Sequence, residues 1–136
     1  MNASLLNAAI FDAPWTEQST ADFLRAAERA DIPAGERPDV VERAKGQRHA
    51  VLALEGQRVG TLIYEVERGE MYVTAMVAAA PGRLDLLSTF YPGIEDLARR
   101  HGCASIRFGT SRPGMVETMK RYGYRVAEVF MRKEIQ

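Results

Sequence analysis

Few residues in this sequence combine a reactive side chain with the spacing that chemistry requires. The single cysteine, Cys103, follows a predicted helix end, so we interpret it as a small buried residue rather than a nucleophile. His49 lies in an apolar stretch and His101 at a helix end, where structural roles are the simpler interpretation. No nucleophile-elbow sequence surrounds Ser88, Ser105 or Ser111. One cysteine and two histidines cannot build a common zinc site, so we predict no metal centre.

Charge and composition exclude further classes of protein. The 18 lysines and arginines balance the 18 acidic residues, which removes the electrostatic basis for nucleic acid or an anionic membrane as the main partner. The chain has 136 residues, 46% hydrophobic and 26% charged, as in a globular domain. The longest weakly polar run, 71–81, is too short to cross a bilayer. The first residues lack a secretory pattern, and we expect one cytoplasmic domain over 1–136.

The first half of the chain predicts helices followed by strands. Residues 1–16 contain a short apolar stretch that we interpret as an arm or a first edge strand. A helix is expected from about Thr20 to Ala30, capped by Thr16 or Ser19, with Asp22 on its wet side. A second short helix should follow at 39–45. Three strands in tight succession then predict an antiparallel meander, at 49–55, 59–67 and 71–78.

The second half returns to helical periodicity. A helix ending before Gly102 is expected, with Pro92-Gly93 kinking or splitting it. A strand at 104–108 and a helix from Pro113 to Gly123 follow, and 124–135 alternates as a final strand. The fold class is therefore α+β, with a mixed, mostly antiparallel sheet of about six or seven strands flanked by helices.

This order of elements resembles the GNAT superfamily of N-acetyltransferases. The run from Leu97 to Cys103 looks like that family's long helix and its exit into the fifth strand. The run from Met119 to Tyr124, followed by a strand ending Met131-Arg-Lys133, looks like its closing helix, Gly-aromatic and strand signature. Arg112-Pro113-Gly114 is similar to small GNAT-like proteins encoded by bacteriophages. The resemblance extends from about Thr20 onward.

The resemblance implies acetyl-CoA as cofactor, with its pyrophosphate on the loop after the fourth strand. Glycines there let the backbone approach the phosphates at a helix N-terminus. In this sequence Asp85 and Leu87 occupy the two places for small residues, and a carboxylate repels a pyrophosphate. Gly82 and Arg83 could still supply a turn and one phosphate contact, or form only a solvated turn. Backbone groups that could hold the pantetheine arm belong to Met76, Val77 and Ala78.

The catalytic residues that the resemblance implies are also altered. The family often uses a tyrosine four residues before the late glycine as an acid, and that place is Met119 here. Tyr122 is close in sequence but points about 60° away around the helix. Candidates for a base or a water relay are Glu65 and Thr74, although strand alternation alone explains Glu65 as an exposed residue.

Three candidate functions remain. The one that we favour from sequence is a GNAT-fold protein with a degenerate acetyl-CoA site, acting as a structural or interaction module, in one version a virion-associated phage component. The alternative is an acetyl-CoA-dependent N-acetyltransferase acting on a small-molecule or protein amine. A third is a regulatory domain that binds CoA without turnover. We also expect a protein partner or a homo-oligomer, through the N-terminal segment that contains Trp15.

Overall fold

The computed structural model describes residues 7–79, 85–110 and 113–135. In this part of the chain a sheet of five strands runs in the order β1-β2-β3-β4-β5. The first four strands are antiparallel neighbours, and β5 is parallel to β4. The strands are β1 (Ala8–Asp12), β2 (Arg48–Leu54), β3 (Gln57–Glu67), β4 (Glu70–Ala78) and β5 (Ser105–Phe108). The predicted meander and the α+β class are confirmed.

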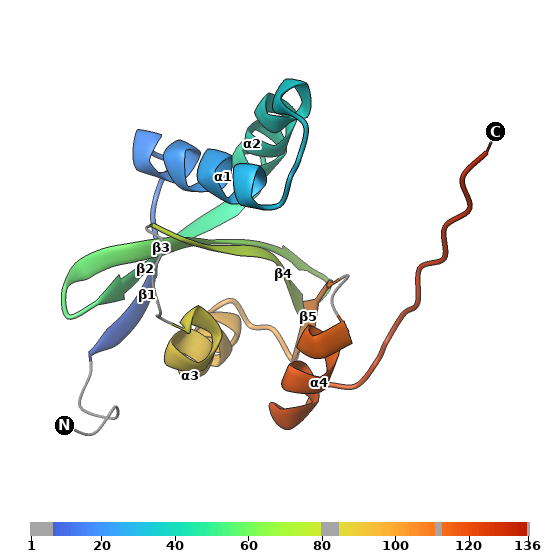
Figure 1. Cartoon of the computed structure of the whole chain (residues 1–136). Coiled ribbons are helices and arrows are strands. Elements are labelled where there is room, and N and C mark those ends of the chain that lie inside the picture. The colour runs from blue at the N-terminus through green and yellow to red at the C-terminus, as the bar shows by residue number, and fades with distance from the viewer. Residues whose placement is uncertain (1–6, 80–84, 111–112, 136) are drawn as a thin grey trace.

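Helices cover both faces of the sheet (Figure 1). On one face lie α1 (Glu17–Arg29) and α2 (Arg37–Lys45), joined through a 3-10 turn at Ala34–Glu36. On the other face lie α3 (Leu86–Arg100) and α4 (Pro113–Arg121). None of the helices in the described ranges is long and apolar enough to cross a membrane.

The helix α1 begins at a capping box in which Thr16 and Ser19 satisfy each other's backbone N–H groups. Just before it, the ring of Trp15 lies 5.4 Å from the ring of Phe23 and 5.2 Å from that of His49, measured between centroids. The indole N–H donates to Thr20 Oγ1 at 2.7 Å. Trp15 therefore joins α1 to β2 within the chain, and residues 8–12 form an edge strand rather than a free arm.

Asp22 was expected on the wet side of α1, and that prediction is wrong. Its side chain is only 2% exposed, and Oδ2 accepts from Nη2 of Arg58 at 2.5 Å. Arg25 reaches Oδ1 of the same carboxylate at 2.9 Å, and Thr61 donates to Oδ2 at 3.4 Å. The burial of the carboxylate is compensated by its ion pairs with two guanidinium groups where α1 crosses β3.

The helix α3 packs on the main hydrophobic core, which contains Leu52, Leu62, Tyr64, Met71 and Ile94. Of the two effects expected from Pro92-Gly93, a kink or a split, the split is absent, because one helix extends over Leu86–Arg100. Its buried apolar face outweighs the hydrogen bond that proline cannot make. Beside it, a Cβ on Gly93 would lie 3.1 Å from Ile10 Cδ1, so this glycine allows α3 to lie close to β1.

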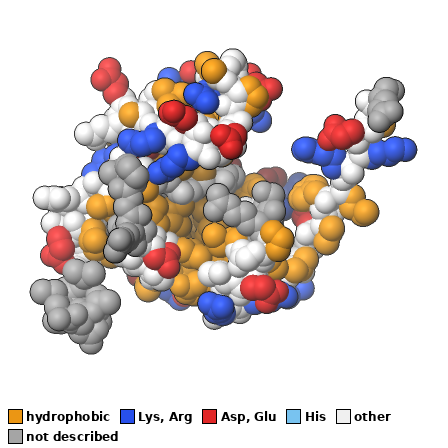
Figure 2. Space-filling model, viewed as in Figure 1, with side chains coloured by type: hydrophobic (Ala, Val, Ile, Leu, Met, Phe, Trp, Pro, Cys, Tyr) orange, Lys and Arg blue, Asp and Glu red, His pale blue; other side chains and the backbone are white. Residues whose placement is uncertain are grey.

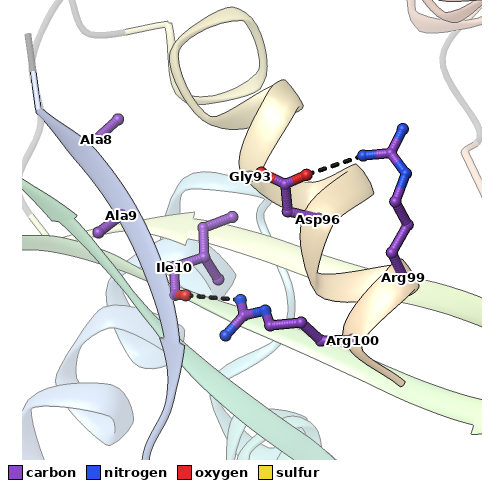
Figure 3. A pocket seen from close by; sticks show the side chains of 7 residues that line it. All are labelled: Ala8, Ala9, Ile10, Gly93, Asp96, Arg99 and Arg100. Atoms are coloured by element: carbon purple, nitrogen blue, oxygen red, sulfur yellow. Dashed lines mark hydrogen bonds and ion pairs between the residues drawn. The ribbon is translucent and has the colours of Figure 1, made fainter. Parts of the chain in front are cut away.

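One side chain of α3, Arg100, reaches the outer edge of β1 (Figure 3). Arg100 donates to the carbonyl oxygen of Ile10 at 3.0 Å, while Arg99 turns to Asp96 at 2.8 Å. A shallow surface pocket lies between the two elements. The outward acceptor in the middle of β1 is thus occupied by a charged donor.

The strand expected at 124–135 is absent, and this correction also lowers the strand count to five in the described ranges. Residues 124–135, here called the C-terminal arm, extend away from the body after α4 (Figure 1). Alternation along a sequence cannot make a strand unless a neighbouring strand supplies hydrogen-bond partners. In the described part of the chain, no strand pairs with the C-terminal arm.

Candidate functional site

A gap opens between β4 and β5. The two strands pair only from Glu70 with Ser105 to Val73 with Phe108. Beyond that point β4 continues to Ala78 while β5 has ended. The pairing of β3 with β4 slips at the same level, because Ile63 pairs with Ala75 but Tyr64 pairs with Val73. Thr74 is therefore the extra residue of a β-bulge, which bends the end of β4 away from β5.

Backbone polar groups of β4 face this gap. The N–H of Ala79 donates to Val59, and the carbonyl oxygen of Val77 points at Gly60, so both lie on the β3 side. Because successive residues of a strand direct their polar groups to opposite sides, Met76 and Ala78 direct theirs toward the gap. Of the three predicted cofactor contacts on β4, these two fit an extended amide-containing arm, whereas Val77 is used within the sheet.

The N-terminus of α3 lies at the far end of the loop that follows β4. Asp85 caps this helix, and its Oδ1 accepts from the N–H of Ser88 at 3.2 Å. The carboxylate therefore accepts a hydrogen bond from one of the N–H groups that a phosphate would use. It also adds a negative charge at this end of the helix. The predicted contacts Gly82 and Arg83 lie outside the described residues. Among the described residues, the outward backbone groups of Met76 and Ala78 remain outside the β3–β4 pairing, whereas the start of α3 already carries a carboxylate.

Tyr72 lies where the gap begins, and the sequence analysis did not select it. It pairs with Arg107 next to the last β4–β5 pair. A Cβ on Gly109, just past β5, would lie 2.8 Å from the Tyr72 hydroxyl, so this hydroxyl lies over the end of β5. The guanidinium of Arg107 stacks on the phenol ring at 4.5 Å from its centroid. The sequence signal that could have selected Tyr72 was the alternation of side chains along its strand. In the structure Tyr72 pairs with Glu65 of β3, and the two side chains lie on the same face of the sheet.

The three predicted catalytic candidates are not brought together. Glu65 lies on β3 opposite Tyr72, partly buried. The hydroxyl of Thr74 is held by Gln47 and by the carbonyl oxygen of Ile63, so it stabilises the bulge. Tyr122 lies on the other face of the sheet, where its ring stacks on Tyr91 with 4.2 Å between centroids.

The phenols on that other face form a buried cluster. Burial raises the pKa of Tyr91 above its ordinary value of 10.0, and burial, followed by the interaction of its hydroxyl with Tyr91, raises the pKa of Tyr124. Both phenols therefore stay protonated at neutral pH. The ring of Tyr124 also meets that of Phe108 edge-on at 5.6 Å, which fixes the base of the C-terminal arm against β5.

No cluster of metal-ligating residues is found in 7–79, 85–110 and 113–135, the only residues searched. The described residues at the gap are instead Met76 and Ala78, with outward backbone groups, and Tyr72 where the gap begins, while Glu65 lies on the neighbouring strand β3. Such a set can hold a flexible amide-rich chain and exchange protons with a group at its end.

Comparisons with known proteins agree on the fold. No family model matches the sequence, and no curated protein matches it by sequence. Among solved structures, a possible acetyltransferase from Clostridium difficile is similar with a TM-score of 0.69 at 9% identity, over 95% of this chain and 97% of that one. A GNAT-family acetyltransferase from Streptococcus pneumoniae is similar with a TM-score of 0.58 at 11% identity, covering 94% and 100% of the respective chains.

The aminoglycoside N-acetyltransferase AAC(6')-Iy in complex with CoA is also similar, with a TM-score of 0.58 at 13% identity. The alignment covers 96% of this chain and 97% of that chain. At such identities the likeness concerns the fold, not the residues of a site. The chain has the α+β fold of GNAT acetyltransferases, as its sequence resemblance implied.

Proposed function

We propose that this chain is an acetyl-CoA-dependent N-acetyltransferase whose cofactor arm enters the gap between β4 and β5. The observation that carries the proposal is the set of outward backbone groups at Met76 and Ala78 beyond the end of β5. These groups are preorganised, because the rest of β4 is held by β3 and by the bulge at Thr74. Similar folds include an acetyltransferase that binds CoA, which favours this ligand over other amide-containing chains.

Acetyl-CoA would supply an activated acetyl thioester. The amine nitrogen forms a bond to the carbonyl carbon, the carbon–sulfur bond breaks, and the thiolate takes a proton. In this chain Glu65 is the candidate to accept a proton from the amine, and Tyr72 the candidate to donate one to sulfur. They lie on one face of the sheet, on opposite strands. Ile63, two residues before Glu65 on β3, packs with α1 and α2, so the amine would approach from the side of these helices.

The gap can be tested by removing one N–H that the sheet does not use. Ala78→Pro deletes a donor that points away from β3, so β3–β4 pairing should survive. We expect acetyl-CoA to raise the melting temperature of the natural chain, because a ligand that binds only the folded state stabilises it. Ala78→Pro should abolish most of that shift without lowering the melting temperature of the free protein by more than a few degrees.

The matched control is Gly35→Ala, a substitution remote from the gap at a glycine where a Cβ would meet nothing within 4 Å. It should leave the acetyl-CoA shift unchanged. If millimolar acetyl-CoA produces no shift in the natural chain, and no acetylation of a panel of amines is seen, the proposal is wrong. A shift that Ala78→Pro leaves intact would place the ligand elsewhere.

A second candidate function is a binding module without turnover, of which a virion-associated phage component is one form. The specific observation in its favour is the Asp85 carboxylate on the Ser88 N–H at the start of α3. Asp85→Asn keeps an N-cap but removes the charge. If the phosphates of CoA lie there, this variant should bind CoA several-fold more tightly than the natural chain. No CoA binding by either protein would favour the module.

A further inference from the structure

An arginine of α1 contacts the backbone just beyond the end of β4. Nη2 of Arg25 donates to the carbonyl oxygen of Ala79 at 2.6 Å. Figure 2 shows basic side chains between α1 and the part of the sheet beneath it. The N–H of Ala79 donates to the carbonyl oxygen of Val59 on β3 at 2.8 Å. The two backbone polar groups of Ala79 are thus held by two different elements, a helix and a strand.

These contacts fix the peptide group that precedes Ala79. A peptide unit is planar and trans, so the carbonyl oxygen of Ala78 points away from the N–H of Ala79. Because that N–H is directed at β3, the carbonyl oxygen of Ala78 is directed into the gap. Without Arg25, only one of these hydrogen bonds would hold Ala79, and a strand end held by fewer hydrogen bonds opens more often. Arg25 therefore helps to keep a polar group of the gap in its outward direction.

The guanidinium of Arg25 is itself held in place. Its Nη2 lies 2.9 Å from Oδ1 of Asp22, three residues earlier in α1. The other carboxylate oxygen, Oδ2, accepts from Arg58 on β3, so the buried carboxylate is fixed from the side of the sheet as well. A long side chain that is already immobilised loses little further entropy when the contact that it supports is used. The ion-pair network thus extends from β3 through α1 to the end of β4.

We propose that Arg25 is a positioning residue for the acetyl-CoA arm, holding the carbonyl oxygen of Ala79 and so keeping the backbone groups of Ala78 directed into the gap. The inference rests on the proposed function, because it assigns to Arg25 a part in binding that cofactor. Arg25 acts through the backbone and not on the reacting atoms. Its loss should therefore weaken the binding of acetyl-CoA and leave the chemical step unchanged.

The first measurement needs no cofactor. Amide hydrogen exchange reports how often the hydrogen bond from Ala79 to β3 opens. In Arg25→Gln the amide of Ala79 should exchange about tenfold faster, while that of Leu62, in the middle of β3, reports global opening. The matched control Arg29→Gln, at an exposed arginine in the last turn of α1, should leave both rates unchanged. An Ala79 amide that exchanges no faster in Arg25→Gln than in the natural chain would overturn the proposal.

The second measurement is the dissociation constant of acetyl-CoA, obtained by titration calorimetry. Arg25→Gln should raise it about tenfold, and kcat at saturating acetyl-CoA should stay within about twofold of the natural value. Arg25→Lys keeps a charged donor and should restore part of the affinity. Arg29→Gln should bind as the natural chain does. Tyr64→Phe, which loses hydrogen bonds on the side of β1 and α3, controls for lowered stability alone and should also bind normally.

The results separate this inference from the proposed function. If the natural chain binds no acetyl-CoA, the proposed function fails, and the part of Arg25 in binding falls with it. If the natural chain binds acetyl-CoA and Arg25→Gln binds it equally well, only the positioning role is wrong. A fall in kcat at an unchanged dissociation constant would also contradict that role. Should Arg25→Gln not fold, Arg25→Lys takes its place, and natural affinity together with natural exchange at Ala79 in a Lys variant that lacks the contact to Ala79 would overturn the proposal.

Discussion

The phenol oxygen of Tyr64 lies 2.9 Å from Nε2 of His101, which joins the central strand β3 to the end of α3. The same hydroxyl donates its one proton to Asp12 on β1. Nε2 of His101 must therefore carry the proton that the phenol oxygen accepts. One side chain of the core thus links three elements that are far apart in the sequence.

Removing this hydroxyl should destabilise the fold at neutral pH and reduce its sensitivity to alkali. Burial, and next the hydrogen bond to Asp12, raise the pKa of Tyr64 above its ordinary value of 10.0. Above pH 10 the folded chain therefore holds more protons than the unfolded chain, and its stability falls as pH rises. Tyr64→Phe should cost about 1–2 kcal/mol at pH 7 and flatten the decline above pH 10, measured by urea unfolding. An unchanged alkaline decline would contradict this assignment.

Asp22→Ala should be among the most damaging substitutions of a polar residue. It leaves Arg58 and Arg25, both partly buried, without their shared carboxylate. A loss of about 3 kcal/mol in the free energy of unfolding is expected. The control Asp96→Ala breaks an exposed pair with Arg99 and should cost less than about 0.5 kcal/mol. Similar losses of unfolding free energy in the two variants would mean that the buried Asp22 network stabilises the fold no more than an exposed ion pair does.

Gly60→Ala should disturb the end of β4 from across the sheet. A Cβ at this position would lie 2.4 Å from the carbonyl oxygen of Val77, which cannot move without displacing β4. We expect a loss of about 2 kcal/mol and a smaller acetyl-CoA shift in melting temperature. Gly35→Ala should change neither quantity. A Gly60→Ala protein with normal stability would show that the two strands can separate freely here.

Tyr72→Phe tests the proposed acid, and Tyr122→Phe is its control. If Tyr72 donates a proton to the leaving sulfur, the phenylalanine variant should lose roughly 10- to 100-fold in kcat with little change in KM for acetyl-CoA. Tyr122→Phe keeps the ring stacked on Tyr91 and should retain full activity. The reverse result would restore Tyr122 as the acid. Release of CoA thiol is the measurement for both.

Local patterns predicted most of the elements because they depend on neighbours in sequence. The meander was predicted at 49–55, 59–67 and 71–78 from an apolar run, alternation and two short turns. The first helix was predicted from about Thr20 with Thr16 or Ser19 as its cap, and it begins earlier, at Glu17, with Thr16 as the cap. The candidate site was harder to predict from the sequence than the helices and strands. The gap depends on where β5 stops and on a bulge at Thr74, and neither has a local signature in this sequence. Tyr72 could be selected as a candidate only from the structure, which shows its hydroxyl beside Gly109 at the end of β5.

The two clearest errors have a common physical origin. Asp22 was assigned to solvent because aspartate on a helix usually faces water, but Arg58 of β3 reaches it from 36 residues away, beside Arg25 of the same helix. The segment 124–135 was assigned to a strand because its side chains alternate, but a strand also needs a partner. In both cases the deciding interaction is long-range, and a single sequence read locally does not contain it.

The arginine that contacts β1 has a consequence for the first edge of the sheet. Arg100 donates to the outward carbonyl oxygen of Ile10, so a charged side chain of the same molecule satisfies an acceptor that a strand of another molecule could otherwise use. The residue that closes α3 thus also makes the middle of this edge a poorer template for intermolecular strand pairing.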